Sequence, residues 1–230
     1  MKLFQKKSFV LLLILMLAVS CCGCKTDAEK EADRAKKNWA QTTNEDKMSI
    51  YCALIKEYML LTDALGENTP YPAMKRSVKG SMMSSGLTMD EALENAKQVI
   101  IQEQAIFWYG EKVGIVAGDE EVANFIKNNV LVELKASETY EAVDEACNKE
   151  GITFEDTIWA YESSYKMQYI LKEAGVKSED EIAFVNDLVE DYGETEAYAL
   201  LMTVLDTCGE FIKVGETDKD VLKSADIYMN

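Results

Sequence analysis

The sequence contains no histidine. Histidine is the general base of Ser-His-Asp and Cys-His active sites and a common zinc ligand, so its absence excludes these nucleophilic enzymes and every histidine-ligated metal centre. Cysteine is sparse beyond residue 24, where only Cys52, Cys147 and Cys208 follow. The sequence therefore predicts no enzyme, no catalytic residue, no metal site and no cofactor.

Proline, aromatic residues and positive charge are also scarce. The chain has 2 prolines and 9% aromatic residues, which argues against both a disordered stalk and an all-β sandwich. Its 24 basic residues stand against 41 acidic ones, a net charge of −17. A surface this negative repels nucleic acid and anionic lipid, so neither is an expected partner of the folded part.

The first twenty residues have the pattern of a signal peptide. Lys2, Lys6 and Lys7 form a positive segment, and residues 9–19 are an unbroken apolar run. Such a run is too short to cross a hydrocarbon core, which takes about 20 residues, but it fits the apolar segment of a signal peptide, about 7–15 residues long. The sequence predicts a cleaved signal over residues 1–20.

The segment LAVSC, ending at Cys21, resembles the lipobox of bacterial lipoproteins. In that family the cysteine is acylated, for example with palmitate, and becomes the first residue of the mature chain. Leu17 lies one position further out than the preferred leucine, so Cys22 and Cys24 stay as alternative acceptors. The resemblance implies an exported protein on the extracytoplasmic side of a cell membrane, held there by its lipid anchor alone.

The mature chain divides into a polar start and a helical body. Residues 1–20 hold three basic residues and no acidic one, so their removal takes the net charge to −20. Residues 21–46 are polar, and either a flexible spacer or a solvated helix is expected there. The folded domain is expected over residues 47–230, and its oligomeric state is not predicted.

Apolar residues recur at three- and four-residue spacing through most of this domain, as in amphipathic helices. Pro70 and Pro72 interrupt the pattern. Thr88 with Glu91, and Ser178 with Glu181, have the spacing of capping boxes that begin a helix. The sequence predicts an all-α fold without recognisable strands, with helices near 88–113, 119–132, 138–149, 154–173, 178–192 and 195–213.

Glycine signals separate these helices. A glycine ends one helix, an aliphatic residue folds back on its last turn, and a cap begins the next helix. Within residues 88–174 two such signals resemble the helical chaperone domain of the SurA and PrsA extracytoplasmic foldases, which is related to the peptide-binding domain of trigger factor. The matching residues are Gly114, Ile115, Asp119, Glu120, Glu121 and Val122, and then Gly151, Ile152, Thr153, Glu155 and Asp156.

This resemblance implies a SurA-like helical array that binds unfolded or extended exported polypeptides. Gly118 stands where the family has a threonine, and the short strand that often opens the family's domain is not recognisable near residues 25–50. The C-terminal helices at 178–213 lie in a segment too short for the family's parvulin isomerase domain, whose paired histidines are also missing. A chaperone without isomerase activity is therefore implied.

Six residues are candidates for peptide binding. Methionine suits adaptable binding surfaces, and three successive aromatic residues on one helix spread over about 200°, so they do not all face one core. Core packing is the alternative for each residue taken singly. The candidates are Met82, Met83, Met89, Phe107, Trp108 and Tyr109.

Other features have plainer interpretations. The acidic runs 119–121 and 179–181 fall in first helical turns, where the helix dipole favours carboxylates, so they indicate no metal site. An exported chain can pair two of Cys52, Cys147 and Cys208 and leaves one over. Each lies in an apolar helical pattern, and buried free thiols are the expectation.

Two other functions stay open beside the chaperone. A structural or interaction lipoprotein that docks one dedicated envelope partner predicts a flat exposed apolar patch, whereas a chaperone predicts a concave surface lined by methionine and aromatic residues. A ligand-binding lipoprotein serving a transporter usually has a two-lobed α/β architecture, which the absence of strands disfavours.

Overall fold

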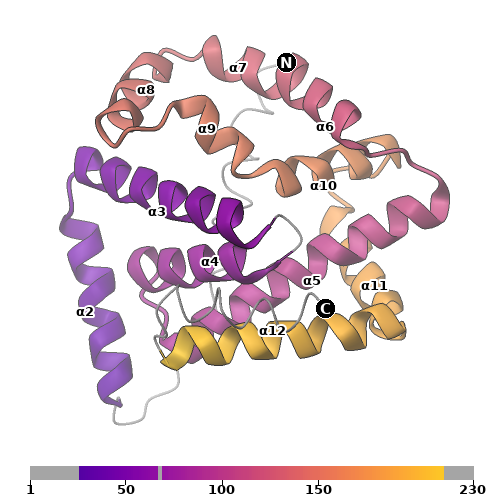
Figure 1. Cartoon of the computed structure of the whole chain (residues 1–230), viewed down its shortest axis with the longest axis horizontal. Coiled ribbons are helices and arrows are strands. Elements are labelled where there is room, and N and C mark those ends of the chain that lie inside the picture. Colours follow the sequence, from indigo (N-terminus) through magenta and orange to yellow (C-terminus); the bar gives the residue numbers. More distant parts are fainter. Residues whose placement is uncertain (1–25, 67–68, 215–230) are drawn as a thin grey trace.

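The computed structural model describes residues 26–66 and 69–214, and every regular element in them is helical (Figure 1). No strand occurs in these ranges, which confirms the predicted all-α class. The signal peptide and Cys21, Cys22 and Cys24 lie outside them. The elements are α2 (Asp27–Gln41), α3 (Asn44–Leu65), α4 (Tyr71–Ser84), α5 (Met89–Val113), α6 (Asp119–Phe125), the π-helical segment η1 (Ile126–Val130), α7 (Leu131–Lys135), α8 (Tyr140–Lys149), α9 (Phe154–Trp159), α10 (Glu162–Glu173), α11 (Glu181–Gly193) and α12 (Glu196–Val214).

Helix α5 begins and ends as its sequence signals predict. The Thr88 hydroxyl accepts a hydrogen bond from the Glu91 N–H, and the Glu91 carboxylate accepts one from the Thr88 N–H at 2.8 Å. At the other end Gly114 has a left-handed backbone with φ 75°, and the Ile115 N–H donates to the Gly110 carbonyl at 2.9 Å. These contacts satisfy backbone groups that the helix itself leaves unpaired.

The predicted Ser178 cap is wrong. Residues 178–180 form a turn, and α11 begins after Asp180 with no side-chain cap. The Asp180 N–H donates to the Lys177 carbonyl at 2.9 Å, so this backbone turn occupies the positions that a capping box needs. The predicted helix near 119–132 also differs, because a π-helical segment separates α6 from α7.

The predicted single helix over 154–173 is interrupted between α9 and α10. Tyr161 leaves the helical region, with φ −113° and ψ 23°. The carbonyl of Ala160 accepts a hydrogen bond from the Arg76 guanidinium at 2.6 Å, in place of the backbone N–H that a continuous helix supplies. A contact from α4, distant in sequence, thus accompanies the break.

For residues 21–46 the sequence predicts either a flexible spacer or a solvated helix, and residues 27–41 form the helix α2. This helix packs against α4 and the turn that follows it (Figure 1). The approach is close at Gly86, where an added Cβ would lie 2.5 Å from the Lys36 Cβ and 2.6 Å from the Ala32 carbonyl oxygen. Gly86 also has a positive φ of 63°, so both its backbone and its neighbour favour glycine.

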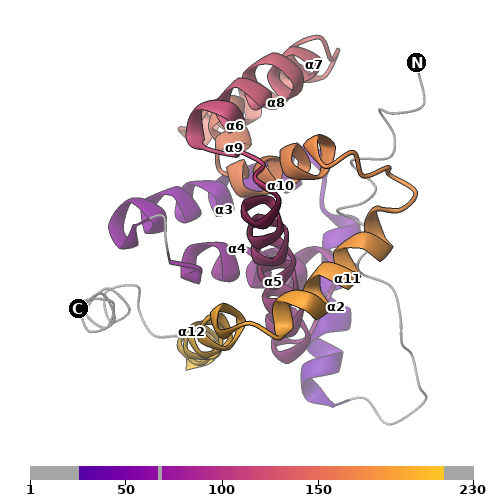
Figure 2. The same ribbon diagram turned by 90° about the vertical axis from the view of Figure 1, so that its right-hand side faces the viewer.

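Helix α5 lies in the middle of the molecule (Figure 2). Its N-terminal half packs against α4 and α12 in one hydrophobic cluster, and its C-terminal half packs against α10 and α11 in another. Representative buried members are Met74, Val78, Leu93, Ala96 and Leu205 in the first cluster and Ala105, Ile106, Ile170 and Leu188 in the second. Helix α5 thus contributes residues to both hydrophobic clusters and connects them.

The segment from α6 to α9 forms an arch, residues 119–159, that closes back on α3 (Figure 1). Two smaller clusters hold it. One joins Cys52 and Ile55 of α3 to Cys147 of α8, and the other packs α6, η1 and α7 against Ile158 of α9. None of the helices described has the length and hydrophobicity of a membrane span.

Replacing Gly86 tests the docking of α2. Gly86→Ala is expected to lower the free energy of unfolding by about 2–4 kcal/mol, because the methyl group meets the α2 backbone and the positive φ is strained. Gly114→Ala is the matched control. Its φ is 75° but nothing lies within 4 Å of the added Cβ, so about 1 kcal/mol is expected. Equal losses in urea unfolding would contradict close packing at Gly86.

Candidate functional site

The six residues predicted to bind peptide do not lie together. Met82 and Met89 pack at the edge of the cluster around the N-terminal half of α5, and Met83 is half-buried near them. Phe107, Trp108 and Tyr109 lie toward the other end of α5, about 27 Å along the helix from Met89. Peptide binding by any of them remains a prediction, but they do not line one common surface.

Each of the three aromatic rings is half-buried against a different neighbour. Phe107 lies under the Lys166 ammonium at 4.9 Å from α10, and Trp108 lies 6.0 Å from the Tyr192 ring of α11. Tyr109 makes an edge contact with Phe184 at 5.2 Å. Because α10 and α11 cover two sides of α5, all three rings find partners despite their angular spread.

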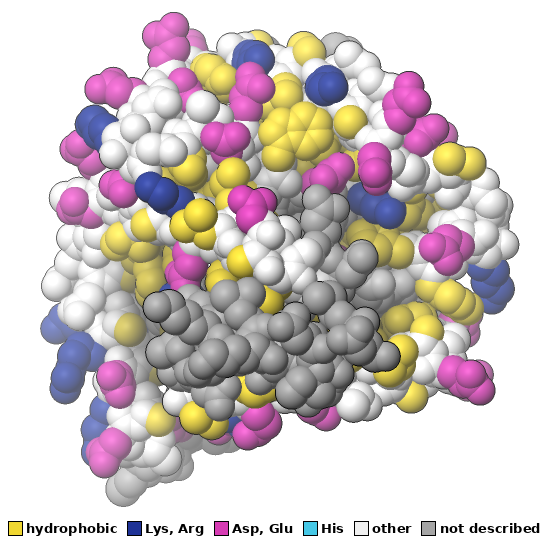
Figure 3. All heavy atoms as spheres, in the orientation of Figure 1, with side chains coloured by type: hydrophobic (Ala, Val, Ile, Leu, Met, Phe, Trp, Pro, Cys, Tyr) yellow, Lys and Arg dark blue, Asp and Glu magenta, His cyan; other side chains and the backbone are white. Residues whose placement is uncertain are grey.

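An apolar groove lies instead along α3. Ala53, Leu60, Leu61 and Ala64 form its apolar surface, and its volume is about 440 Å³. Leu60 is 61% exposed, whereas Leu61 next to it is buried. Hydrophobic patches separated by charged side chains cover the molecular face in Figure 3. We call the groove along α3, together with the charged residues at its edge, the α3 groove.

The rim of the α3 groove is formed by Lys56, Glu57 and Glu150. The Lys56 ammonium donates to the Glu150 carbonyl at 3.0 Å, which joins α3 to the end of α8. Glu57 forms ion pairs with Lys79 at 2.6 Å and Lys75 at 3.1 Å, both on α4. Burial raises the pKa of Glu57, but the hydrogen bonds from these lysines outweigh it and hold the pKa below its usual range. Of the rim carboxylates, Glu57 is thus neutralised by two lysines of α4.

Arg76 lies between two aromatic rings beside this groove. Its guanidinium carbon is 4.1 Å from the Tyr58 ring centre and 4.0 Å from that of Tyr161, while one of its N–H groups donates to Ala160. Tyr51 also stacks with Tyr161, with 6.3 Å between the ring centres and an angle of 4° between the rings. This stack ties α3 and α4 to the junction of α9 and α10.

The sequence carries a signal for this stack that periodicity misses. Arg34 and Arg76 are its only arginines among 24 basic residues. A planar guanidinium stacks on aromatic faces, whereas the ammonium of lysine does not match that shape. In the structure Arg76 is stacked and Arg34 is exposed, so the scarcity of arginine draws attention to both positions but shows neither which one stacks nor which tyrosines it meets.

Glu103 is the one buried acidic side chain in the described part of the chain, 9% exposed. Its carboxylate accepts hydrogen bonds from the hydroxyls of Ser163 at 3.1 Å and Ser164 at 3.4 Å. Burial raises its pKa, and the nearby positive charge of Arg76 opposes that rise. These hydrogen bonds join α5 to α10.

The remaining features add no chemical site. In residues 26–66 and 69–214 no group of three or more cysteine, aspartate or glutamate side chains is placed to hold a metal ion. Buried side-chain nitrogen and oxygen atoms in the same ranges all have hydrogen-bond partners. No protein family, curated protein or solved structure matches this chain.

The Arg76 stack predicts a loss that charge alone does not explain. Arg76→Lys keeps the positive charge but loses the planar contact with both tyrosines, so the free energy of unfolding is expected to fall by about 1–2 kcal/mol. Arg34→Lys on exposed α2 is the control and should change it by less than about 0.5 kcal/mol. A similar small effect for both variants in urea titrations would remove the stack as a stabilising contact.

Glu103 predicts a pH dependence. Its raised pKa means that the folded protein favours the neutral carboxyl, so this contribution to stability is complete below the unfolded pKa of about 4.3 and is lost as pH rises through the folded value. Glu103→Gln keeps a polar group there without a charge. The stability of this variant relative to the wild type should increase from pH 4 to pH 7, measured by urea unfolding. A difference that is constant with pH would mean that Glu103 does not titrate in this range.

Proposed function

We propose that this chain is a membrane-anchored extracytoplasmic protein of chaperone type. It binds unfolded or extended segments of exported proteins and has no isomerase activity. The lipid acceptor is Cys21, with Cys22 and Cys24 as alternatives, and all three lie outside the described residues. The observation that carries the proposal is the α3 groove, an open apolar surface. Alanine and leucine line it, in place of the methionine and aromatic residues that we expected of a chaperone.

The groove has properties suited to weak, reversible binding. Leucine side chains contribute about 1.5–3 kcal/mol each when a partner covers them, and the groove offers few of them. A client segment therefore gains enough to be held briefly, but not enough to be trapped. Of the rim charges, Glu57 is paired with Lys75 and Lys79, whereas the Lys56 ammonium donates to the backbone carbonyl of Glu150 and forms no ion pair with its carboxylate.

The charge of the protein sets the preferred client. The mature chain is expected to carry a net charge of −20, so basic segments are attracted and acidic proteins are repelled. This attraction weakens at higher salt, because the Debye length falls to about 8 Å at physiological ionic strength. Apolar contact in the groove persists in salt, and the two contributions are separable.

The resemblance to SurA and PrsA supports the same function. The long helix α5 ends at Gly114, α6 starts at Asp119, and α9 starts at Thr153 with a capping box formed with Asp156. These are the positions on which the resemblance rests. A SurA-like helical array without a parvulin domain is thus the finer architecture that we propose.

A second candidate is docking to one dedicated envelope partner, and α12 favours it. Leu200, Val204 and Val214 are 68%, 37% and 72% exposed. At about 100° per residue they share one face of the helix within about 80°, an arrangement that a partner helix can cover. We call these three residues the α12 stripe.

The two surfaces are distinguished by matched leucine variants. Leu60→Glu places a charge in the α3 groove, and Leu200→Glu places one at a similarly exposed position on the α12 stripe. The full-length protein in mild detergent is expected to suppress light scattering of a chemically unfolded basic client at near-stoichiometric ratio, at low and moderate salt. Leu60→Glu should lose at least half of this suppression, and Leu200→Glu should retain it.

The reverse result has an equally clear meaning. Loss only in Leu200→Glu would assign binding to the α12 stripe and favour a dedicated partner, to be sought by crosslinking at the cell surface. No suppression by the wild type beyond that of an equally acidic, inert helical protein would overturn the chaperone proposal.

A further inference from the structure

Two cysteines from distant parts of the chain meet in the core. Cys52 of α3 and Cys147 of α8 are separated by 95 positions, and their Sγ atoms are 2.8 Å apart. Both side chains are completely buried, with 0% exposed. A disulfide bond is about 2.0 Å long, so a shift of less than about 1 Å brings the two sulfur atoms to bonding distance.

Polar contacts on both sides of the pair fix the register of α3 against α8. Glu45, Ser49, Cys52 and Lys56 lie at four- and three-residue spacing and therefore share one face of α3. Along this face Glu45 pairs with Lys149 at 3.1 Å, the Ser49 hydroxyl donates to the Glu150 carboxylate, and Lys56 donates to the Glu150 carbonyl at 3.0 Å. The meeting of the two sulfur atoms is part of a continuous interface.

Cys208 cannot compete for either partner. It lies in the cluster formed by α4, α5 and α12, whereas Cys52 and Cys147 lie in the cluster that joins α3 to the arch. All three cysteines in the described residues are buried free thiols in the structure, as expected, with two of them adjacent and Cys208 apart. This placement resolves which two of the three can pair, a choice that the odd count left open.

The surroundings of the pair do not suit other cysteine chemistry. Ile55, Ile152 and Ala160 are the other buried members of the cluster, and no third metal-ligating side chain accompanies the two thiols. Burial raises the pKa of Cys147 to about 12 and also raises that of Cys52. Neither thiol is an accessible nucleophile in the folded protein, so a structural covalent bond is the role that fits.

We propose that Cys52 and Cys147 form a disulfide in the exported protein, which ties the arch to α3. The two thiols together lose two protons and two electrons as the S–S bond forms. The oxidant is a disulfide in the extracytoplasmic space, either in a protein or in the oxidised form of a small thiol. It is reduced to two thiols. The thiolate of one cysteine attacks that disulfide, forms a mixed disulfide and releases the first thiol of the carrier. The second cysteine then attacks the sulfur of the first cysteine and displaces the second thiol of the carrier.

Burial sets when the reaction takes place. The carrier cannot reach either sulfur once α8 has docked on α3, so the mixed disulfide forms while this interface is still open, during folding after export. Once formed, the bond is protected from reductants for the same reason. The bond also fixes Glu150, the rim residue of the α3 groove that α3 itself does not supply, but the inference does not depend on what the groove binds.

Peptide mapping of the exported full-length protein tests the proposal directly. The protein is isolated from the membrane under acid, unfolded, and alkylated without reductant, then digested and analysed by mass spectrometry. The expected result is a linked peptide pair containing Cys52 and Cys147, with Cys208 alkylated. Alkylation of all three cysteines, or a link that includes Cys208, would overturn the assignment.

A melting experiment on the same protein provides an independent readout. Reduction after transient unfolding should lower the melting temperature by roughly 5–15 °C, the shift that loss of one long-loop disulfide gives in a protein of this size. Cys208→Ser should show the same drop on reduction, whereas the double variant Cys52→Ala, Cys147→Ala should show none. A wild-type melting temperature that reductant does not change would count against the bond, whatever the stability of the double variant.

Discussion

Helix α5 carries apolar side chains around much of its circumference, and a helix of this kind is stable in water only when other helices cover it. Along its N-terminal half α4 and α12 provide the cover, and along its C-terminal half α10 and α11 do so. The capped ends at Thr88 and Gly114 fix its length. The positions of the neighbouring helices follow from this one requirement for burial.

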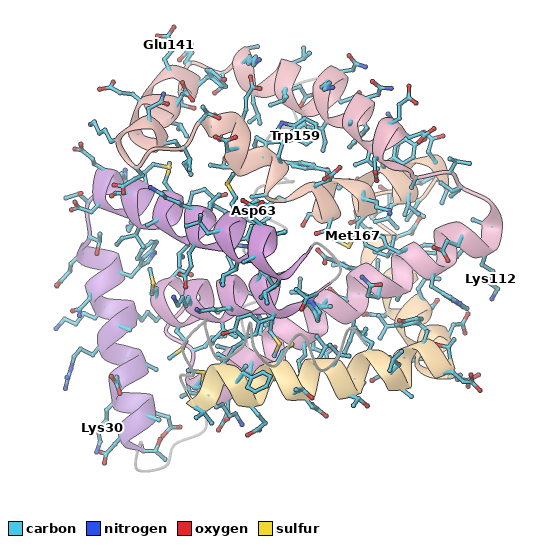
Figure 4. The ribbon with its side chains drawn as sticks, viewed as in Figure 1. Lys30, Asp63, Lys112, Glu141, Trp159 and Met167 are labelled. Carbon is cyan, nitrogen blue, oxygen red and sulfur yellow. The ribbon has the colours of Figure 1, made fainter. Side chains whose placement is uncertain are left out.

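The arch depends less on a large apolar cluster and more on individual side-chain contacts than the helices around α5. Its clusters are smaller, and it is joined to the rest of the molecule by discrete contacts between specific side chains (Figure 4 draws the side chains and labels Trp159 of α9). Arg76 fastens the junction of α9 and α10, and the contacts of Glu45, Ser49 and Lys56 fasten the end of α8. Local stability is thus expected to be lower in the arch than around α5.

Local patterns predicted the helical elements well, because they depend on neighbours within a few residues. The apolar periodicity and the glycine signals gave α5, α8 and α12 to within about two residues, and Thr88 and Thr153 cap as expected. The Ser178 cap failed where a backbone turn took its place. The break at Tyr161 was missed because its partner, Arg76, lies on another helix.

The candidate site was much harder to predict than the fold. Methionine and aromatic residues were chosen for their chemistry, but whether a side chain lines a groove depends on which helices cover it. Phe107, Trp108 and Tyr109 are covered by α10 and α11, whereas Leu60 looks like an ordinary core position in the sequence and is left open. Such coverage is a property of tertiary packing, and the spacing of residues along one helix does not contain it.

For a chain anchored as we propose, the helical start of the folded body would limit how far from the membrane it can reach. Because α2 begins at Asp27 and lies against α4, most of the polar segment 21–46 belongs to the folded body and does not serve as a flexible tether. A lipid on Cys21 would leave a stretch that spans at most about 18 Å when fully extended. With that anchor, the folded body would stay within a thin layer next to the bilayer, where anionic headgroups would repel its negative net charge.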